Sequence, residues 1–158
     1  MRNFIISLFI VILLFVLYYR YNLNPEQIEY AKVKSVIDGD TIVLEDGRTV
    51  RYIGIDTPEK DSSYTKYECY SKQAHEKNSE LVLNKDIKLV ADIEKNDRYD
   101  RYLYYIYTMD DLFINEELVK GGYAESKAYP PNLAKQYILD KAEEFAKKNS
   151  IGLWNCIQ

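Results

Sequence analysis

Short runs of alternating apolar and polar residues, divided by turn residues, fill the chain from Tyr30 to Thr108. A period of two is typical of strands with one buried face, and Gly, Asp, Asn or Pro between the runs indicate turns. The Asp46-Gly47 pair is a signal for a hairpin. The pattern predicts five strands, over residues 30–37, 41–44, 49–55, 87–93 and 102–108.

Other segments have the spacing of helices. Apolar side chains recur at helical spacing over residues 71–83 and 133–146, and Asn115 is placed to cap a short helix that ends at Gly121. Trp154, in a closing turn, is expected to pack on the core. Strands with inserted and appended helices predict an α+β fold, a five-stranded OB-type β-barrel with about three helices. Such barrels are common platforms for oligonucleotides.

The N-terminal segment has a different character. An uncharged run from Phe4 to Tyr19 is predicted to be a transmembrane helix, although at ~1.5 Å per residue it covers roughly 24 Å, slightly less than a ~30 Å hydrocarbon core. No small-residue cleavage pattern follows, which favours an uncleaved anchor over the cleaved signal of a secreted form. The chain would then comprise an anchor (1–21), a linker (22–27) and one domain (28–158). This predicts a single-pass membrane protein whose domain lies outside the cytoplasm.

Composition restricts the partners. The 158 residues suffice for one domain with a small appendage, and the formal net charge is −4. Because Arg2 and Arg20 belong to the anchor, the remainder is more acidic than the total. This argues against binding nucleic acid through a broadly basic face, but it leaves room for a local positive cleft. No protein partner is implied.

The two cysteines, Cys69 and Cys156, lie near opposite ends of the domain sequence. An even count in an exported domain is compatible with a disulfide. Such a bridge would close a loop of ~87 residues and contribute up to ~4 kcal/mol in the chain-entropy model. The alternative is two unpaired thiols.

Charged residues gather in three segments, each at the end of a predicted strand: Asp38-Gly39-Asp40-Thr41, Arg51 to Glu59, and Asp97 to Arg101. Each segment alone has a plain structural interpretation, as a turn, a strand exit or a solvated loop. Together they combine carboxylates, which suit Ca²⁺ or Mg²⁺, with arginines, which grip phosphate oxygens with a planar fork. Such a combination suits phosphodiester hydrolysis, whose transition state carries additional negative charge.

The order and spacing of these segments resemble the staphylococcal-nuclease-like (thermonuclease) family. The D-G-D-T turn, the R-x-x-x-x-D-T-P-E pattern and the Tyr-x-Arg loop before a strand are present nearly intact, and the resemblance extends from about Val33 to Trp154. It implies a Ca²⁺-dependent endonuclease that cleaves DNA and RNA with low sequence specificity and leaves 3′-phosphate ends. Exported relatives often pair a cysteine before the helix with one near this tryptophan, which favours Cys69–Cys156.

The resemblance also implies the roles of metal-binding residues. Asp40 and Asp56 would bind Ca²⁺ through their carboxylates, and Thr57 through its backbone carbonyl. Asp38 would support them from beside the metal.

Catalysis and substrate binding would fall to other residues. Arg51 and Arg101 would bind the scissile phosphate, and Glu59 would orient or deprotonate the attacking water. Arg98 is a further substrate-binding candidate. Tyr129 would stack on a base or sugar, which is a sequence-tolerant contact.

One position departs from the family pattern: Asp100 stands where glycine is common. This carboxylate would either draw Arg101 away from phosphate or pair with Arg98 at the surface.

Two other functions remain open. The chain could be a binding module that kept the OB-type fold but lost hydrolysis, anchored to the membrane. It could also be a structural cell-surface protein in which the charged residues form only ion pairs. The presence of Arg51, Glu59 and Arg101 together favours the enzyme.

Overall fold

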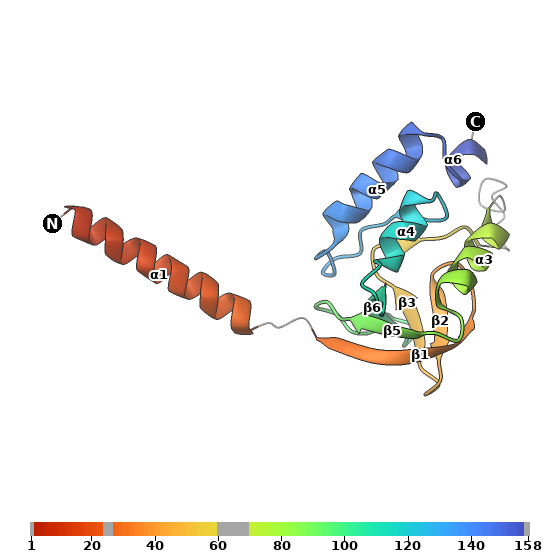
Figure 1. Cartoon of the computed structure of the whole chain (residues 1–158), viewed down its shortest axis with the longest axis horizontal. Helices are drawn as coiled ribbons and strands as arrows, with labels where there is room; N and C mark the ends of the chain where they lie inside the picture. The colour runs from red at the N-terminus through yellow and green to blue at the C-terminus, as the bar shows by residue number, and fades with distance from the viewer. Residues whose placement is uncertain (1, 24–26, 60–69, 157–158) are drawn as a thin grey trace.

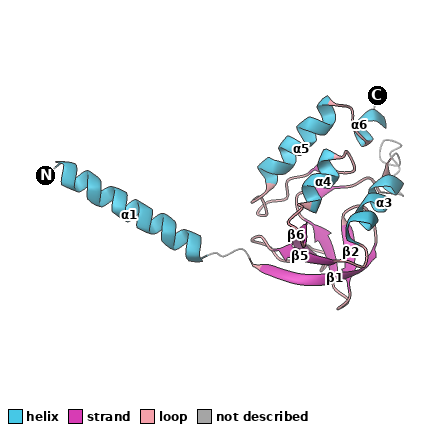
Figure 2. Cartoon of the chain, in the orientation of Figure 1, coloured by secondary structure: helices cyan, strands magenta, loops and turns pink. Residues whose placement is uncertain are grey.

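The computed structural model describes residues 2–23, 27–59 and 70–156 (Figure 1). In chain order its elements are α1 (Arg2–Leu23), β1 (Ile28–Val36), β2 (Thr41–Leu44), β3 (Thr49–Tyr52), β4 (Ile55–Asp56), α3 (Ser71–Val82), β5 (Asp86–Val90), β6 (Tyr102–Thr108), α4 (Ile114–Lys120), β7 (Glu125–Ser126), α5 (Gln136–Lys148) and α6 (Leu153–Cys156). Figure 2 shows α3, α4 and α5 gathered on one side of the strands.

Five strands close into a barrel in the order β1-β2-β3-β6-β5, which confirms the predicted five-stranded barrel. Neighbours are antiparallel except β3 and β6, which run parallel and pair Val50 with Tyr102. The long strand β1 pairs with both β5 and β2, and an irregularity between Val33 and Ser35 interrupts its pairing with β2. A bulge of this kind bends and twists a strand, which lets β1 serve two neighbours in a small closed barrel.

The predicted strand over residues 49–55 is two strands in the structure, β3 and β4. Gly54 has φ +79°, a left-handed conformation that glycine adopts without steric cost, and here it turns the chain out of the barrel. A Cβ at this position would lie 2.5 Å from Cδ1 of Leu139 in α5. Strand β4 then pairs with β7, and Asp56 lies opposite Glu125.

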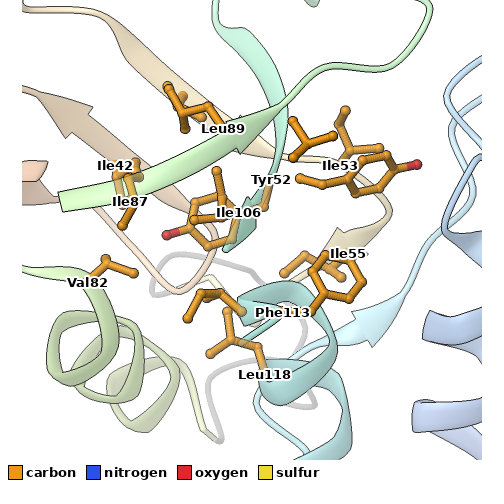
Figure 3. Packing of buried hydrophobic residues seen from close by; sticks show 14 of the residues in the cluster. Ile42, Tyr52, Ile53, Ile55, Val82, Ile87, Leu89, Ile106, Phe113 and Leu118 are labelled. Atoms are coloured by element: carbon orange, nitrogen blue, oxygen red, sulfur yellow. The ribbon is translucent and has the colours of Figure 1, made fainter. Parts of the chain in front are cut away.

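The core fills the barrel and continues under α3 and α4. Aliphatic side chains from β2, β5 and β6 meet the ring of Tyr52 inside, while Phe113 and Leu118 cover one end (Figure 3). Leu139 and Ala142 extend this cluster to α5. Helix α5 therefore buries one stripe, as its apolar spacing predicts, and leaves Tyr137 exposed on its other side.

Two local predictions about the helices are wrong. Asn115 does not cap α4, because Phe113 is the N-cap residue and the Asn115 side chain is fully buried, accepting from the Ile106 N–H and donating to the Ile53 carbonyl. Trp154 is only half-buried, with the Lys147 ammonium 4.4 Å from its ring centre, and the neighbouring Leu153 is the residue that enters the interior.

The predicted transmembrane anchor is also wrong. Helix α1 is continuous over 22 residues, yet among the described residues no helix is long and apolar enough to cross a membrane. The physical reason is the length of the apolar segment, since the charge-free run between Arg2 and Arg20 covers roughly 24 Å against a ~30 Å hydrocarbon core. The predicted single-pass membrane localisation is overturned with it, and the predicted membrane partner is left without support.

Candidate active site

Three of the predicted site residues meet at one ion-pair cluster. Arg51, on β3, pairs through Nη1 with Oδ1 of Asp40 and through Nη2 with Oδ1 of Asp56, the latter at 2.6 Å. Asp40 is fully buried and the Arg51 side chain is 13% exposed, so water screens this pair only weakly, whereas the Asp56 side chain is 39% exposed. The turn after β1 and the end of β4 are thereby joined across β3.

The second oxygen of Asp40 is also fully used. Its Oδ2 accepts from the backbone N–H and the hydroxyl of Thr57, at 2.8 and 2.9 Å, while the Thr41 hydroxyl donates to Oδ1 at 3.1 Å. These bonds hold the Asp56-Thr57 segment against the turn. They also give hydrogen-bond partners to both oxygens of a carboxylate that has no exposed surface.

The turn that carries Asp40 is fixed by its own polar groups. Asp38 Oδ1 accepts from the Asp40 N–H at 3.0 Å, and the Ile37 N–H donates to the Thr41 carbonyl at 2.9 Å. Burial raises the pKa of the Asp38 carboxyl, although the Arg51 charge and hydrogen bonds from Thr41 act in the opposite direction. Aspartate forms such side-chain turns readily, which is why this sequence closes tightly between two strands.

Two buried hydrogen bonds, which the sequence did not predict, support the turn that carries Asp40. The Tyr52 hydroxyl donates to Oδ1 of Asn78 at 2.9 Å, and Nδ2 of Asn78 donates to the Asp38 carbonyl at 3.0 Å. Asn78 is a fully buried residue of α3, one turn after the buried Ala74. A polar residue on the apolar face of a helix was the signal that could have revealed it.

A pocket of about 540 Å³ shares Arg51 with the cluster and brings together further predicted site residues. Its lining includes Arg51, Arg98, Tyr99, Arg101 and Tyr129. The residues come from β3, the loop before β6 and the loop after β7, which lie far apart in the sequence. The structure therefore gathers both predicted catalytic arginines and both predicted substrate-binding residues around one cavity.

Arg101 is held by Asp97, a residue to which the sequence analysis assigned no role. Oδ2 of Asp97 accepts from Nε of Arg101 at 2.7 Å and is 2.7 Å from Nη2, while Oδ1 accepts from the backbone N–H groups of Tyr99 and Arg101 at 2.9 and 3.0 Å. Burial alone would raise the pKa of Asp97, but the hydrogen bonds from Arg101 and Tyr99 and the Arg101 charge outweigh it and leave the pKa below its usual value. Aspartate often accepts a hydrogen bond from the backbone N–H two residues later, in an Asx turn, and this tendency could have indicated the role of Asp97.

Neither pairing considered for Asp100 is found among the described residues. Arg101 pairs with Asp97, and Arg98 donates to the Tyr99 hydroxyl at 2.7 Å with its guanidinium 4.8 Å from the centre of that ring. Asp100 itself is exposed and has φ +63°. Glycine adopts this conformation with less strain than other residues, so a glycine would suit the backbone at this position.

Other predicted residues lie at the edge of what the structure describes. Glu59 is exposed and follows Pro58 directly before the segment 60–69, which lies outside the described residues. Cys156, in α6, is in a disulfide bond. Its predicted partner, Cys69, lies outside the described residues, so this pairing stays a prediction.

The carboxylates suit a hard cation in chemistry, although they are engaged elsewhere. Within residues 2–23, 27–59 and 70–156, no group of three or more histidine, cysteine, aspartate or glutamate side chains is gathered closely enough to hold a metal ion. Asp40 and Asp56 nonetheless provide the oxygen donors that Ca²⁺ prefers. Both now bind Arg51, so a cation would compete with Arg51 for the same oxygens.

Comparison with known proteins agrees with this geometry. Residues 49–156 match the sequence model of the family described as Staphylococcal nuclease homologue. The Thermonuclease of Staphylococcus intermedius is 38% identical over 125 residues, which cover 77% of this chain and 74% of that protein. The Thermonuclease of Staphylococcus hyicus is 37% identical over 127 residues, covering 78% and 75%. Endonuclease YncB of Bacillus subtilis (strain 168) is 34% identical over 139 residues, covering 84% and 64%.

The five-stranded barrel, the turn that carries Asp38 and Asp40, and the arginine-lined pocket fit a phosphodiester-hydrolysing nuclease. The family match assigns the chain to this class of enzyme. The chain belongs to the staphylococcal nuclease family.

Proposed function

We propose that this nuclease depends on Ca²⁺ and hydrolyses both DNA and RNA with low sequence specificity, leaving 3′-phosphate ends. The observation that carries the proposal is the pocket of about 540 Å³ in which Arg51, Arg98 and Arg101 converge beside Asp40 and Asp56. The proposal concerns the cofactor, the range of substrates and the roles of the residues, all of which go beyond membership of the family.

The charge of the pocket supports an anionic substrate. The whole chain carries a formal net charge of −4, yet in this one cavity three arginines outnumber two acidic residues, Glu94 and Asp97. Arginine stays protonated and offers several N–H donors in one plane, so it can bind two phosphate oxygens at once. A phosphodiester is therefore attracted to this pocket although the protein as a whole repels it.

The two predicted catalytic arginines would act on the scissile phosphate. Arg51 and Arg101 have side chains that are 13% and 32% exposed, so they are partly withdrawn from water and their charges act strongly on a bound anion. Preorganised donors of this kind stabilise the extra negative charge of the transition state.

Glu59 would activate the nucleophile, which is a water molecule. Its exposed carboxylate can orient a water molecule and accept its proton as the water attacks phosphorus. In-line attack breaks the bond to the 5′ oxygen, which leaves with a proton as a 5′-hydroxyl, and the phosphate remains on the 3′ side. Asp40, Asp56 and the Thr57 carbonyl would hold Ca²⁺, which supplies charge stabilisation when it is bound.

The aromatic residues of the pocket explain why sequence specificity would be low. Tyr129 is 48% exposed and lines the pocket, so its ring is accessible to a ligand there. The Tyr99 ring, which also lines the pocket, already contacts the guanidinium groups of Arg98 and Arg101. Stacking accepts any base, because every base has a π face, and it is equally available to DNA and RNA.

The test uses the full chain with single-stranded DNA or RNA, in Ca²⁺ or in EGTA. We expect cleavage of both polymers in Ca²⁺, loss of cleavage in EGTA, and fragments from which a phosphatase removes a 3′-terminal phosphate. Glu59→Gln should reduce kcat by about 10²-fold or more, because general-base catalysis contributes that much. Glu76→Gln serves as the matched control, since Glu76 is an exposed residue of α3 that pairs with exposed Lys72.

Three results would contradict the proposal. Cleavage that persists in excess EGTA removes Ca²⁺ from the mechanism, and normal turnover by Glu59→Gln removes the assigned base. Binding of the polymers without cleavage would favour the binding-module alternative.

A further inference from the structure

The loop between β7 and α5 forms one wall of the pocket, yet little of it is buried. From Lys127 to Ala134 every residue is exposed except Asn132, whose exposed fraction is 2%. Tyr129, the predicted stacking residue, belongs to this loop. An exposed loop needs a fixed point if it is to hold an aromatic ring in place, and Asn132 is the buried residue available for that task.

The Asn132 side chain makes a two-point contact with the opposite loop. Its Oδ1 accepts from the backbone N–H of Glu94 at 2.8 Å, and its Nδ2 donates to the Glu94 carbonyl at 2.9 Å. A primary amide is a donor and an acceptor at once, so it can satisfy both backbone groups of one residue. Alanine offers neither group, and aspartate offers only acceptors at neutral pH.

Asn132 is also bonded directly to Tyr129. Its backbone N–H donates to the Tyr129 carbonyl at 3.1 Å, and the two residues form an isolated bridge. The backbone of the tyrosine is thus tied to Asn132, and Asn132 is tied to Glu94. Any shift of Asn132 away from Glu94 moves the ring of Tyr129 relative to the pocket.

On the Glu94 side of this contact, the chain continues into the loop that carries Arg98 and Arg101. Lys95, next to Glu94, accepts at its carbonyl from the Leu103 N–H at 2.8 Å, and Asn96 bridges Tyr102 at the start of β6. Between these anchors lies the loop of Arg98 and Arg101. The Asn132–Glu94 contact therefore connects the aromatic wall of the pocket to its basic wall.

We infer that Asn132 is a positioning residue for substrate, setting the distance between the Tyr129 ring and the arginines so that a base can stack while its phosphate is bound. This rests on the proposed function, because it concerns how nucleic acid enters the same pocket. Asn132 itself has almost no exposed surface and both ends of its amide are bonded to Glu94, so it acts through Tyr129. Its loss should weaken substrate binding and leave the chemical step nearly unchanged.

The test is a double-mutant cycle of Asn132→Ala and Tyr129→Ala in the full chain, with a short single-stranded DNA as substrate in Ca²⁺. Each single variant should raise KM by about tenfold, the scale expected for one lost stacking contact, with kcat within about twofold of the unchanged protein. The double variant should raise KM no further, because residues that act through one contact are not additive. Asn132→Asp is a second variant of the same shape, for use if Asn132→Ala does not fold.

The matched control is Asn115→Ala. Asn115 is also a buried asparagine with two bonds to backbone, to Ile106 and Ile53, but it belongs to α4 and is not among the residues that line the pocket. We expect this control to lower stability and to leave unchanged the effect of Tyr129→Ala on KM. Thermal unfolding of every variant separates loss of fold from loss of binding.

The outcomes separate this inference from the proposed function. If the unchanged protein does not cleave DNA, the proposed function fails, and the same cycle is measured as the Kd of a fluorescein-labelled single-stranded DNA in EGTA. A normal KM or Kd in folded Asn132→Ala, or effects that add to those of Tyr129→Ala, overturns the positioning role. It is overturned equally if neither Asn132 variant folds, or if the unchanged protein binds no DNA.

Discussion

Replacing Asp97 with asparagine tests how the arginine wall of the pocket is built. The variant keeps one oxygen to accept from the Tyr99 and Arg101 N–H groups, which Asp97 now bonds at 2.9 and 3.0 Å. The other oxygen, which contacts Nε and Nη2 of Arg101 at 2.7 Å each, becomes an NH₂ group. A donor then faces a guanidinium that can only donate, so Arg101 loses its fixed direction while the turn is retained.

The size of the effect follows from exposure. Hydrogen bonds to charged groups contribute ~1.5–3 kcal/mol, and the Asp97 and Arg101 side chains are 18% and 32% exposed, so we expect a loss of about 1–2 kcal/mol in the free energy of unfolding after solvent screening. For activity, complete loss of a preorganised donor costs ~10²–10³-fold in kcat. Because Arg101 is misdirected but still present, kcat/KM should fall by roughly ten- to a hundredfold.

The assay combines urea unfolding with initial rates on single-stranded DNA. Because the pKa of Asp97 is lowered in the folded protein, its contribution to stability is complete above the unfolded pKa of about 3.9 and is lost as the pH falls through the folded value. The stability difference between the protein and Asp97→Asn should therefore be full at neutral pH and shrink in acid. Asp86→Asn, at an exposed position of β5, is the control. Equal stability at neutral pH together with unchanged kcat/KM would refute the assigned role of Asp97.

Arg51→Lys should reduce cleavage strongly, because one ammonium cannot reproduce the planar fork that would bind two phosphate oxygens. Near-normal rates would make Arg51 a structural residue that pairs with Asp40 and Asp56. Asp100→Gly should raise the free energy of unfolding by less than about 1 kcal/mol. Relief of ~1–2 kcal/mol of backbone strain at φ +63° exceeds the ~0.5–1 kcal/mol entropic cost of glycine. Urea unfolding measures the change, and a clear destabilisation contradicts the backbone argument. Leu118→Ala should destabilise by about 3–5 kcal/mol, because this fully buried side chain covers the end of the barrel; a loss below about 1 kcal/mol in thermal or urea unfolding would contradict that packing.

Several features of the barrel were predictable because their causes are local. Strands β2 and β6 have the predicted bounds, and the hairpin between β2 and β3 contains Gly47 at φ +91°, as its Asp-Gly pair requires. Such features depend on alternation and on turn residues a few positions apart. The break within residues 49–55 was not predicted, because it depends on Gly54 lying under Leu139 of a distant helix.

The same distinction between local and long-range causes applies to the polar residues in and near the pocket. The charged segments are visible in the sequence because their residue types suit phosphate and Ca²⁺, and each follows a predictable strand. Asn78, Asp97 and Asn132 were missed, because an asparagine or aspartate in isolation looks like a turn residue or a solvated side chain. Their importance is a matter of burial and of partners elsewhere in the chain.

By itself, the sequence determined the strand pattern, the family and the set of charged residues near the site. Tertiary structure alone decided which of them meet: Arg51 with Asp40 and Asp56, Arg101 with Asp97 instead of Asp100, and both arginines with Tyr129 around one pocket. The physical reason is that turns and alternation depend on neighbours along the chain, whereas ion pairs, burial and pockets depend on distances that exist only after the barrel has closed.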